Sequence, residues 1–470
     1  MSYSCRRATI VYQKTLHVHF VGIGGIGMSG IAELLLNLGY TVSGSDLASS
    51  QITSRLASLG AKITQGHAAE AMEGAAVVVT SSAIPPDNPE VLQARAENVP
   101  VIQRAEMLAE LMRMKKYGIA IAGSHGKTST TSMTSWMLAH AGLDPTIVIG
   151  GKVDALGGNA KLGAGEFLVA EADESDGSFL KLSPVIEVVT NIDLEHLDYY
   201  RDLNHIKETF LRFINKVPFY GTAIVCLDNK NIADILPKIR KRVTTYGLTP
   251  QADIYSDRQE WQNGRVNFNV KTAAGELGEI SIAPPGIHNV YNALAAVGTG
   301  LELEIDFERI RQGLNSYSGV QRRMQKKGVV AGITVVDDYG HHPTEILATL
   351  TAIHKAWPEK RLVVLFQPHR YSRTKALMKE FQVCFHLAEL LILTDIYAAS
   401  EKPIEGVTSE AFVDALRSHG QRNAVYLGGV DTLAGRLRPE LRAGDLVLTL
   451  GAGNIFRAGE QLLEILKGEE

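Results

Sequence analysis

The chain has 470 residues, enough for about three domains of roughly 150 residues each. It carries 47 Lys and Arg residues against 51 Asp and Glu residues, a net charge of −4, so it has no general attraction for nucleic acid or for an anionic membrane. Any anion that it binds must therefore meet a local group of side chains.

The cysteines and the N-terminus indicate the compartment. Cys5, Cys226 and Cys384 lie far apart and form no CxxC pair, which argues against a zinc knuckle or a disulfide framework and suits a reducing compartment. Arg, Gln, Lys and His interrupt residues 1–20 before any apolar stretch of signal-sequence length, and no later run is long enough to span a membrane. We expect a cytoplasmic protein without a membrane or nucleic-acid partner.

The first part of the chain alternates β-rich runs with helical periodicity. The runs at residues 16–24 and 41–46 are strand-like, and residues 28–39 between them have a helical pattern. This rhythm predicts βαβ units with a parallel sheet, and we assign residues 1–110 to a first, Rossmann-like α/β domain.

The first predicted strand leads into a glycine-rich loop, "GIGGIG", at residues 22–27. Gly22, Gly24 and Gly27 follow the strand and open a helix, and Asp46 ends the next strand, which is the dinucleotide fingerprint. Backbone amides at a helix N-terminus can hold a diphosphate where glycine permits close approach. Glycines can also simply allow a tight turn, and Asp46 can either bind a ribose hydroxyl or cap a turn.

A second series of strands begins at residues 117–123 and leads into "GSHGKTST", at residues 123–130. The strict GxxxxGK[ST] pattern fails because Ile121 stands where its first glycine is required. The strand–loop–helix setting still favours a phosphate loop, in which Lys127 meets phosphate and the Thr128 hydroxyl reaches a magnesium ion. We assign residues 111–320 to this central nucleoside triphosphate-binding domain.

Two acidic clusters follow later strands of this domain. "EADESD" supplies Glu171, Asp173, Glu174 and Asp176, and "TNIDLEHLD" supplies Asp193, Glu195, His196 and Asp198. Acidic clusters are usually solvated loops, and a lone histidine is usually structural. Parallel sheets nevertheless place their sites at the carboxyl ends of strands, and Mg²⁺ prefers oxygen ligands, so these clusters predict a metal site beside the phosphate loop.

A third series of buried-type strands follows "GVQRR" and includes "ITVVDDYG", "RLVVLFQPH", "LLILTDIY" and "DLVLTLGAG". We assign residues 321–470 to a C-terminal, Rossmann-like domain. The fold class is therefore α/β, with three consecutive domains and clefts between them in which ligands commonly sit.

The order of the motifs along the chain resembles the Mur ligase family. The motifs are "GIGGIGMSGIAELL", "GSHGKTST", "EADESD", "TNIDLEHLD", "PGIHNVYNA", "GVQRR", "DDYGHHPTE", "FQPHRYSRT" and "LGAGNI", from Gly22 to Asn454. The pair "DDYGHHPTE" and "HRYSRT" is specific, whereas either glycine loop alone is not. The family also uses the shortened phosphate loop, and Glu195 stands where it often has Asp.

The resemblance implies an ATP-dependent ligase that joins L-alanine to UDP-N-acetylmuramate in peptidoglycan synthesis, with Mg²⁺, as a monomer or a homodimer. It implies ATP contacts by Gly123, Ser124, His125, Gly126, Lys127, Thr128, Ser129, Asn289, Asn292, Arg323 and Asp338. It implies UDP-sugar contacts by Gly22, Gly24, Gly25, Ile26, Gly27 and Asp46, and amino-acid contacts by Tyr339, His341, Arg370 and Arg373. The implied metal residues are Thr128, Glu171 and His196, and the implied catalytic residues are Lys127, Glu171, His196, Arg323 and Asp338.

Other functions remain open from the sequence. A recycling ligase that attaches a preformed peptide to UDP-N-acetylmuramate would share these motifs. An NAD-dependent oxidoreductase would explain the first glycine loop and Asp46, but it leaves the second loop and the acidic clusters without a role. A non-catalytic nucleotide switch would bind ATP without substrate-dependent turnover.

Overall fold

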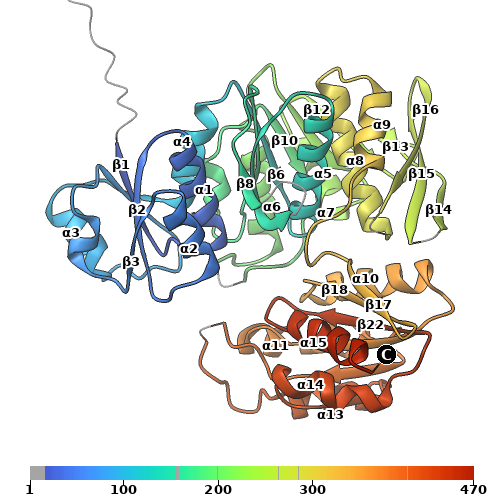
Figure 1. The fold of residues 1–470 in the computed structure, drawn as a ribbon. Coiled ribbons are helices and arrows are strands. Elements are labelled where there is room, and N and C mark those ends of the chain that lie inside the picture. The colour runs from blue at the N-terminus through green and yellow to red at the C-terminus, as the bar shows by residue number, and fades with distance from the viewer. Residues whose placement is uncertain are drawn as a thin grey trace, which may run out of the picture.

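The computed structural model describes residues 16–153, 158–197, 199–262, 264–283, 285–399 and 401–469. Cys5 and Asp198, both named above, lie outside the described residues. Figure 1 shows three α/β parts: a blue N-terminal part, a green-to-yellow middle part and an orange-to-red C-terminal part below the middle one. This confirms the predicted fold class. The strands of the three sheets fall within residues 17–103, 117–282 and 325–450, while domain boundaries near 110 and 320 stay predictions.

The N-terminal sheet is parallel, with strand order β3-β2-β1-β4-β5. Its strands are β1 (His17–Val21), β2 (Thr41–Asp46), β3 (Lys62–Gln65), β4 (Val77–Thr80) and β5 (Val101–Gln103). Its helices are α1 (Ile26–Asn37), α2 (Gln51–Ser58), the 3₁₀ helix η1 (Ala69–Met72), α3 (Pro89–Ala96) and α4 (Arg104–Arg113). The strand order changes direction at β1, so the glycine loop that follows β1 sits at a topological switch point.

The middle sheet has β6 near its centre, flanked by β9 and β10, in the order β14-β15-β13-β12-β11-β10-β6-β9-β7-β8, with β16 paired to β15. Its strands are β6 (Tyr117–Ala122), β7 (Thr146–Val153), β8 (Gly158–Lys161), β9 (Phe167–Glu171), β10 (Ile186–Val189), β11 (Thr222–Cys226), β12 (Val243–Gly247), β13 (Ile254–Tyr255), β14 (Gln259–Gln262), β15 (Arg265–Thr272) and β16 (Gly275–Ile282). Its helices are α5 (Lys127–His140), η3 (Ser178–Lys181), α6 (Leu203–Ile214), α7 (Lys230–Ile235), η4 (Leu236–Lys238), α8 (Ile287–Glu302) and α9 (Phe307–Asn315).

The C-terminal sheet has the order β17-β18-β22-β19-β20-β21, and it is parallel except for the hairpin of β17 and β18. Its strands are β17 (Gln325–Val330), β18 (Ile333–Asp338), β19 (Arg361–Phe366), β20 (Leu390–Leu393), β21 (Ala424–Tyr426) and β22 (Asp445–Leu450). Its helices are α10 (Pro343–Ala356), α11 (Tyr371–Ala376), α12 (Met378–Cys384), α13 (Ser409–Ser418), α14 (Val430–Leu437), η5 (Arg438–Glu440) and α15 (Phe456–Lys467).

The continuous apolar runs of the third series are explained by two cores, one on each face of the C-terminal sheet. Val364 and Phe366 of β19 belong to one core, and Val363 and Leu365 belong to the other. Successive side chains of a strand point to opposite faces, so a strand covered by helices on both sides must be apolar throughout. The carboxyl edge of this sheet faces the middle part, since Asp338 at the end of β18 lines a pocket together with residues of that part.

Two further expectations concern cysteines and membranes. Cys226 and Cys384 are both buried free thiols. Among the described residues, no helix combines the length and apolar character needed to cross a bilayer.

We predict that Phe366→Ala lowers the free energy of unfolding by about 3–5 kcal/mol, because the fully buried ring packs against Phe381, Phe385 and Phe412 and its loss leaves a cavity. Chemical denaturation of the full chain measures this. Val383→Ala is the control, because Val383 is 54% exposed and its truncation should change stability by less than about 0.5 kcal/mol. Equal effects of the two substitutions would contradict the assignment of this core.

Candidate active site

The phosphate-loop pattern forms a tight turn between β6 and α5 that requires glycine at two positions. Gly123 has φ +138°, and a Cβ there would lie 2.0 Å from Thr190 Oγ1. Gly126 has φ +82°, and a Cβ there would lie 2.6 Å from Asn292 Oδ1. The loop is tied to β10, since the His125 amide donates to Asn191 Oδ1 at 2.8 Å and Thr190 Oγ1 donates to the His125 carbonyl at 2.6 Å.

Lys127 begins α5 and folds back over this loop. Its Nζ donates to the Gly123 carbonyl at 2.5 Å and forms an ion pair with Glu174 Oε1 at 2.8 Å. Burial alone would lower the pKa of Lys127, but the Glu174 carboxylate more than offsets this and raises it. The lysine is therefore a fixed positive charge at the phosphate loop.

Two buried carboxylate oxygens near the loop have no hydrogen-bond partner among the described residues: Glu171 Oε1 and Glu174 Oε2. Burial raises the pKa of Glu171, although hydrogen bonds from the Gly150 amide and the Thr128 hydroxyl act in the opposite direction. Buried oxygens without a partner are costly, and hard cations such as Mg²⁺ prefer oxygen ligands. These donors fit a divalent cation.

His196 contacts the acidic residues of both clusters. Its Nε2 lies 3.5 Å from Glu174 Oε1 and 3.8 Å from Glu195 Oε2, and one ligand atom from each of the three residues lies within 4.8 Å of the others. Of the residues in the acidic clusters, Glu171 and His196 are the predicted metal residues. The structure adds Glu174 and Glu195, which lie in the same clusters, as possible ligands.

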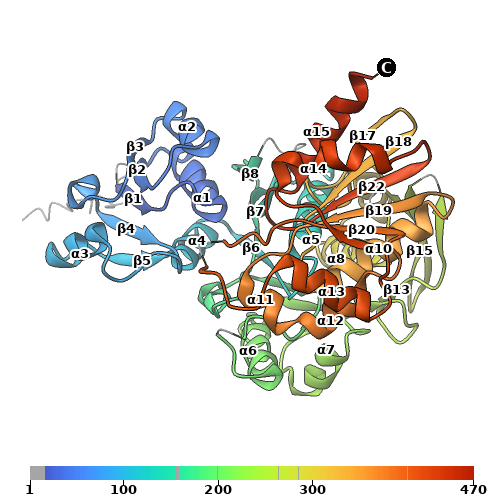
Figure 2. The ribbon, with the colours of Figure 1, turned by 90° about the horizontal axis from the view of Figure 1, so that it is seen from below.

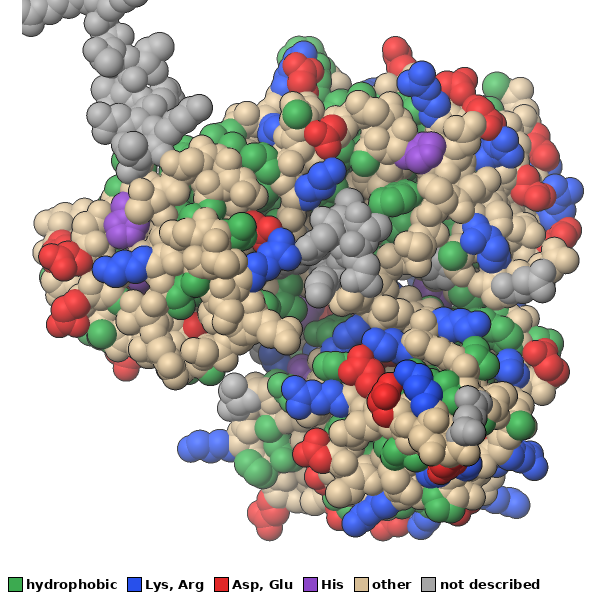
Figure 3. Space-filling model, viewed as in Figure 1, with side chains coloured by type: hydrophobic (Ala, Val, Ile, Leu, Met, Phe, Trp, Pro, Cys, Tyr) green, Lys and Arg blue, Asp and Glu red, His purple; other side chains and the backbone are tan. Residues whose placement is uncertain are grey.

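A pocket of about 410 Å³ lies between the middle and C-terminal parts, beside the phosphate loop. In the space-filling view the two parts meet along a deep furrow (Figure 3). The pocket is lined by several residues predicted to contact ATP, namely His125, Gly126, Ser129, Asn289, Asn292, Arg323 and Asp338. It is also lined by residues that the sequence analysis did not assign, including Asp228, Tyr291, Thr344 and Glu345.

The two asparagines form one hydrogen-bonded chain with α5. Asn292 Nδ2 donates to Asn289 Oδ1 at 3.2 Å, and Thr130 Oγ1 donates to Asn292 Oδ1 at 3.1 Å. Farther along the pocket, the Tyr291 hydroxyl donates to Asp228 Oδ2 at 2.9 Å. Helix α8 therefore presents amide and hydroxyl groups at the pocket, where they can meet a planar heterocycle and a ribose.

Arg323 and Asp338 enter the same pocket from the C-terminal part. Asp338 accepts hydrogen bonds from the Met324 and Gly340 amides, both at 2.8 Å, which fixes the segment that carries Arg323. Burial raises the pKa of Asp338 to about 6, against the opposing influence of the Arg323 guanidinium. Arg323 lies over the Tyr339 ring, 5.2 Å from its centroid.

The phosphate loop contacts the C-terminal part through a buried histidine. His125 Nε2 lies 3.1 Å from Asp193 Oδ2, and its Nδ1 lies 3.5 Å from Glu345 Oε1 on α10. Glu345 also accepts hydrogen bonds from the His341 and His342 amides. A charged histidine thus bridges a carboxylate of the middle part and a carboxylate of the C-terminal part.

A second contact between these parts lies outside the pocket. Lys355 Nζ of α10 lies over the Trp261 ring of β14, 4.7 Å from its centroid. A Cβ on Gly264, after the same strand, would lie 3.0 Å from the Trp357 ring. The hairpin β14–β15 therefore meets the end of α10.

The residues predicted to bind an amino acid gather at the carboxyl ends of β18 and β19. Arg373 Nη1 donates to His369 Nδ1 at 3.0 Å, and the His369 ring lies 5.7 Å from the His341 ring. Burial lowers the pKa of His341 to about 3, so this imidazole is neutral. Arg370 has φ +69° and its amide donates to the Tyr397 carbonyl. Tyr339 lies beside His341 with edge-to-face rings.

The N-terminal glycine loop is a second candidate anion-binding site. The Gly24 amide donates to Asp46 Oδ2 at 2.9 Å, so Asp46 serves the turn, while its possible ribose contact stays a prediction. Gly27 packs closely against Arg104, since a Cβ on Gly27 would lie 2.9 Å from Arg104 Nη1. Gly25 is the N-cap of α1, and Ile26, the first residue of this helix, is 50% exposed. Arg104 also forms an ion pair with Asp173 at 2.8 Å, which joins this loop to the first acidic cluster.

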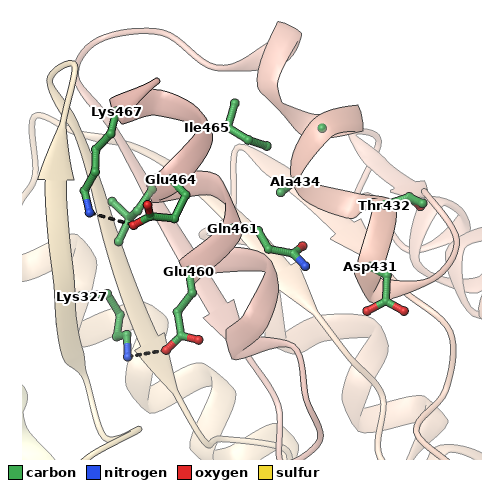
Figure 4. Close-up of a pocket in the computed structure, with 11 residues that line it drawn as sticks. Lys327, Asp431, Thr432, Ala434, Glu460, Gln461, Glu464, Ile465 and Lys467 are labelled. Atoms are coloured by element: carbon green, nitrogen blue, oxygen red, sulfur yellow. Dashed lines mark hydrogen bonds and ion pairs between the residues drawn. The ribbon is translucent and has the colours of Figure 1, made fainter. Parts of the chain in front are cut away.

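Another hollow, of about 860 Å³, lies on the outer side of the C-terminal part between α14, α15 and β17 (Figure 4). Its two lysines, Lys327 and Lys467, are each paired at 2.8 Å, with Glu460 and Glu464. It contains none of the residues predicted from the sequence. We therefore place the candidate active site in the furrow between the parts.

The comparisons with known proteins agree across the whole chain. Three family models match in order: the Mur ligase family catalytic domain at residues 17–116, the Mur ligase middle domain at 121–300 and the Mur ligase glutamate ligase domain at 322–453. A UDP-N-acetylmuramate–L-alanine ligase of Desulfotalea psychrophila is 66% identical over 98% of this chain and 100% of its own length. One from Geobacter sulfurreducens is 58% identical over 97% of this chain and 99% of its own length.

A solved structure is also similar. The crystal structure of a UDP-N-acetylmuramate-alanine ligase from Thermotoga maritima has a TM-score of 0.83 and 27% identity, over 97% of this chain and 100% of that one. Three α/β domains with a phosphate loop at an interdomain pocket define a nucleotide-dependent enzyme class. The chain belongs to the Mur ligase family.

We predict that His125→Gln removes about 2 kcal/mol of the free energy of unfolding at pH 6.5 and much less at pH 10. Burial would lower the pKa of His125, but Asp193 and Glu345 raise it from 6.5 to about 10. Because the folded pKa exceeds the unfolded one, the contribution is complete below pH 6.5 and is lost as the pH rises through 10. Equilibrium denaturation of both proteins across this range measures the difference.

The exposed His386 provides the matched control, His386→Gln. A stability difference between wild type and His125→Gln that stays constant from pH 6.5 to pH 10 would contradict the charged bridge.

Proposed function

We propose that this chain is an ATP-dependent ligase that joins L-alanine to UDP-N-acetylmuramate, a step of peptidoglycan synthesis. The observation that carries the proposal is one pocket that combines the phosphate loop of the middle part with Arg323 and Asp338 of the C-terminal part. The names of the relatives at 66% and 58% identity support the choice of substrates.

ATP would lie in this pocket, with its phosphates over the loop at residues 123–129. The glycines admit phosphate oxygens close to the backbone amides at the start of α5, and Lys127 adds a point charge. Asn289 and Asn292 would face the base, and Asp338 would hold the Arg323 segment in place. Arg323 would then meet the phosphates from the other side.

Mg²⁺ would be held by Thr128, Glu171 and His196, with Glu174 and Glu195 as further oxygen donors. The buried oxygens without partners on Glu171 and Glu174 are the observation that fits a hard cation. When bound, Mg²⁺ would reduce the repulsion between the triphosphate and the substrate carboxylate.

UDP-N-acetylmuramate would bind with its diphosphate at Gly22, Gly24, Gly25, Ile26 and Gly27, near Asp46 and Arg104. The loop lies at the N-terminus of α1, where backbone amides can meet an anion. The Arg104–Asp173 pair places this loop next to the acidic cluster of the middle part, so the sugar would extend toward the phosphate loop.

L-Alanine would be held at Tyr339, His341, Arg370 and Arg373. A guanidinium matches a carboxylate in a forked geometry, and the neutral His341 adds no charge that competes with the incoming ammonium group. Arg373 is close enough to Glu195 for their charges to interact, so the amino acid would lie beside the residues proposed for the metal.

The chemistry needs a leaving group on the muramoyl carboxylate. A carboxylate oxygen attacks the γ-phosphorus, the bond to the bridging oxygen breaks, and ADP leaves with an acyl phosphate formed. The deprotonated amine of alanine then attacks the acyl carbon, and the tetrahedral intermediate expels inorganic phosphate and gives up one nitrogen-bound proton to the phosphate as the amide forms. Lys127 and Arg323 neutralise and position the phosphates, so no covalent protein nucleophile is required.

Two alternatives differ in what they require of the site. A peptide-recycling ligase has the same fold, since a murein peptide ligase from Psychrobacter arcticus matches with a TM-score of 0.70 at 23% identity. An NAD-dependent oxidoreductase would leave the interdomain pocket and its phosphate loop without a role. We further propose a cytoplasmic enzyme that works as a monomer or a homodimer.

We expect ADP release in the presence of UDP-N-acetylmuramate to be fastest with L-alanine and slower with glycine, L-serine or a tripeptide. Lys127→Met should lower kcat at least about 100-fold, because it removes a preorganised charge at the phosphates. Lys116→Met, which changes an exposed lysine, is the control. Normal turnover of Lys127→Met, or a preference for the tripeptide, would contradict the proposed function.

Substitution of the two carboxylates tests the metal site. Glu171→Gln and Glu174→Gln should each raise the Mg²⁺ concentration required for half-maximal turnover at least about tenfold, since each removes an anionic oxygen donor. Asp176→Asn, in the same acidic stretch but hydrogen-bonded to the Ser178 amide, is the matched control. If all three variants keep the wild-type Mg²⁺ requirement, these carboxylates do not bind the ion.

A further inference from the structure

Five cationic side chains form a patch on the outer side of the middle part, here called the basic patch: Arg212, Lys216, Lys238, Arg240 and Lys241. All are exposed except Lys241, which is partly exposed. They come from the end of α6, the turn after it, the last residue of η4 and the segment between η4 and β12. The basic patch has no part in the site described above.

Several contacts show that the two segments of the basic patch are neighbours. Lys238, Arg240 and Lys241 line an open hollow of about 700 Å³ together with Leu211 and Asn215 of the α6 end. The Arg240 amide donates to Asn215 Oδ1 at 2.8 Å. The charges of Lys216 and Lys241 both lower the pKa of the buried Glu187. Each of the two segments therefore brings one lysine close to this carboxyl group.

The charges of the basic patch are not neutralised within the described part of the chain. None of its five side chains is in an ion pair there, whereas Lys207 and Arg242 nearby are paired with Asp234 and Glu302. Burial raises the pKa of Glu187 well above its usual value, against the opposing charges of Lys216 and Lys241. The patch therefore presents a positive potential on a protein whose net charge is −4.

Two aromatic side chains protrude beside the basic patch. Phe219 is 92% exposed and Tyr220 is 59% exposed, with ring centroids 5.2 Å apart in an edge-to-face arrangement. Arg242 Nε donates to the Gly221 carbonyl, which ties this turn to the basic segment. An almost fully hydrated phenylalanine ring gains free energy when a partner removes it from water.

The location of this surface separates it from the active site. The turn at Phe219 and Tyr220 precedes the amino end of β11, while the pocket is reached from the carboxyl end, at Cys226 and Asp228. Figure 2 shows α6 and α7 at the lower edge of that view, on the outer side of the middle part and away from the N-terminal sheet. A partner bound here would leave the pocket open.

We propose that, contrary to the expectation from the sequence of no membrane partner, the basic patch with Phe219 and Tyr220 is a docking surface for an anionic phospholipid bilayer. Cationic side chains are attracted to anionic headgroups, and aromatic rings insert at the level of the headgroups. A second copy of the chain would bring two unneutralised positive surfaces together, which disfavours a symmetric dimer here. A nucleic-acid duplex would explain the cations but not a protruding phenylalanine, because its bases are stacked within the helix. A single strand, whose bases can stack on aromatic rings, is separated from the bilayer by the oligonucleotide measurement below.

Cosedimentation of the full-length protein with vesicles tests this surface. The protein should bind vesicles of phosphatidylcholine mixed with phosphatidylglycerol at low salt, and bind pure phosphatidylcholine vesicles at least about tenfold more weakly. K238E/R240E should weaken binding to the anionic vesicles at least about tenfold and reduce its salt dependence. F219S/Y220S should weaken it by about tenfold while the salt dependence stays.

The control K379E/R422E reverses two exposed cations of the C-terminal part and should bind like wild type. The charge-neutral pair K238Q/R240Q repeats the test if the reversal prevents folding, and unchanged ATP turnover confirms an intact protein. Equal binding to both vesicle types, or wild-type binding by K238E/R240E, overturns the proposal. Binding of an oligonucleotide instead of vesicles, or a dimer lost in F219S/Y220S without vesicle binding, assigns the surface to another partner and also overturns it.

Discussion

The His125 imidazole, buried between Asp193 and Glu345, is the contact on which the geometry of the site depends. It lies within the phosphate loop, so its position is set by β6 and β10, and it contacts α10 of the C-terminal part. Glu345 in turn accepts hydrogen bonds from the His341 and His342 amides, which lie just before α10 in the segment that also carries Tyr339. One buried charge therefore aligns the residues proposed for ATP with those proposed for the amino acid.

The electrostatics of the site follow from an excess of carboxylates around few cations. Lys127 is already paired with Glu174, and His196 lies between Glu174 and Glu195. The buried oxygens that remain without partners among the described residues need a hydrogen-bond donor or a cation, and the proposed divalent ions would supply positive charge there. A triphosphate could then enter a region that would otherwise repel it. Lys127 and Arg323 are the two protein cations proposed to meet its phosphates.

The sequence was sufficient where a local pattern determines the structure. Apolar runs predicted the strands, and glycine spacing predicted both loops, because a positive φ and close packing leave no alternative at Gly123 and Gly126. The antiparallel strands β14 to β16 were not predicted. Polar residues interrupt their apolar pattern, and their pairing depends on contacts outside the parallel part of the sheet. Likewise Glu174 and Glu345 were not assigned as site residues, because nothing in a single sequence shows which of several neighbouring carboxylates faces inward.

Two of the three indoles of the chain lie at the boundary between the middle and C-terminal parts. Trp261 of the middle part contacts Lys355, and Trp357 of the C-terminal part lies beside the turn at Gly264. The third, Trp136, donates to Ser316 Oγ within the middle part. Separation of the two parts would take the ammonium group off one indole and hydrate the other while leaving the third unchanged. Intrinsic fluorescence of the unmodified enzyme is thus an optical gauge of domain opening.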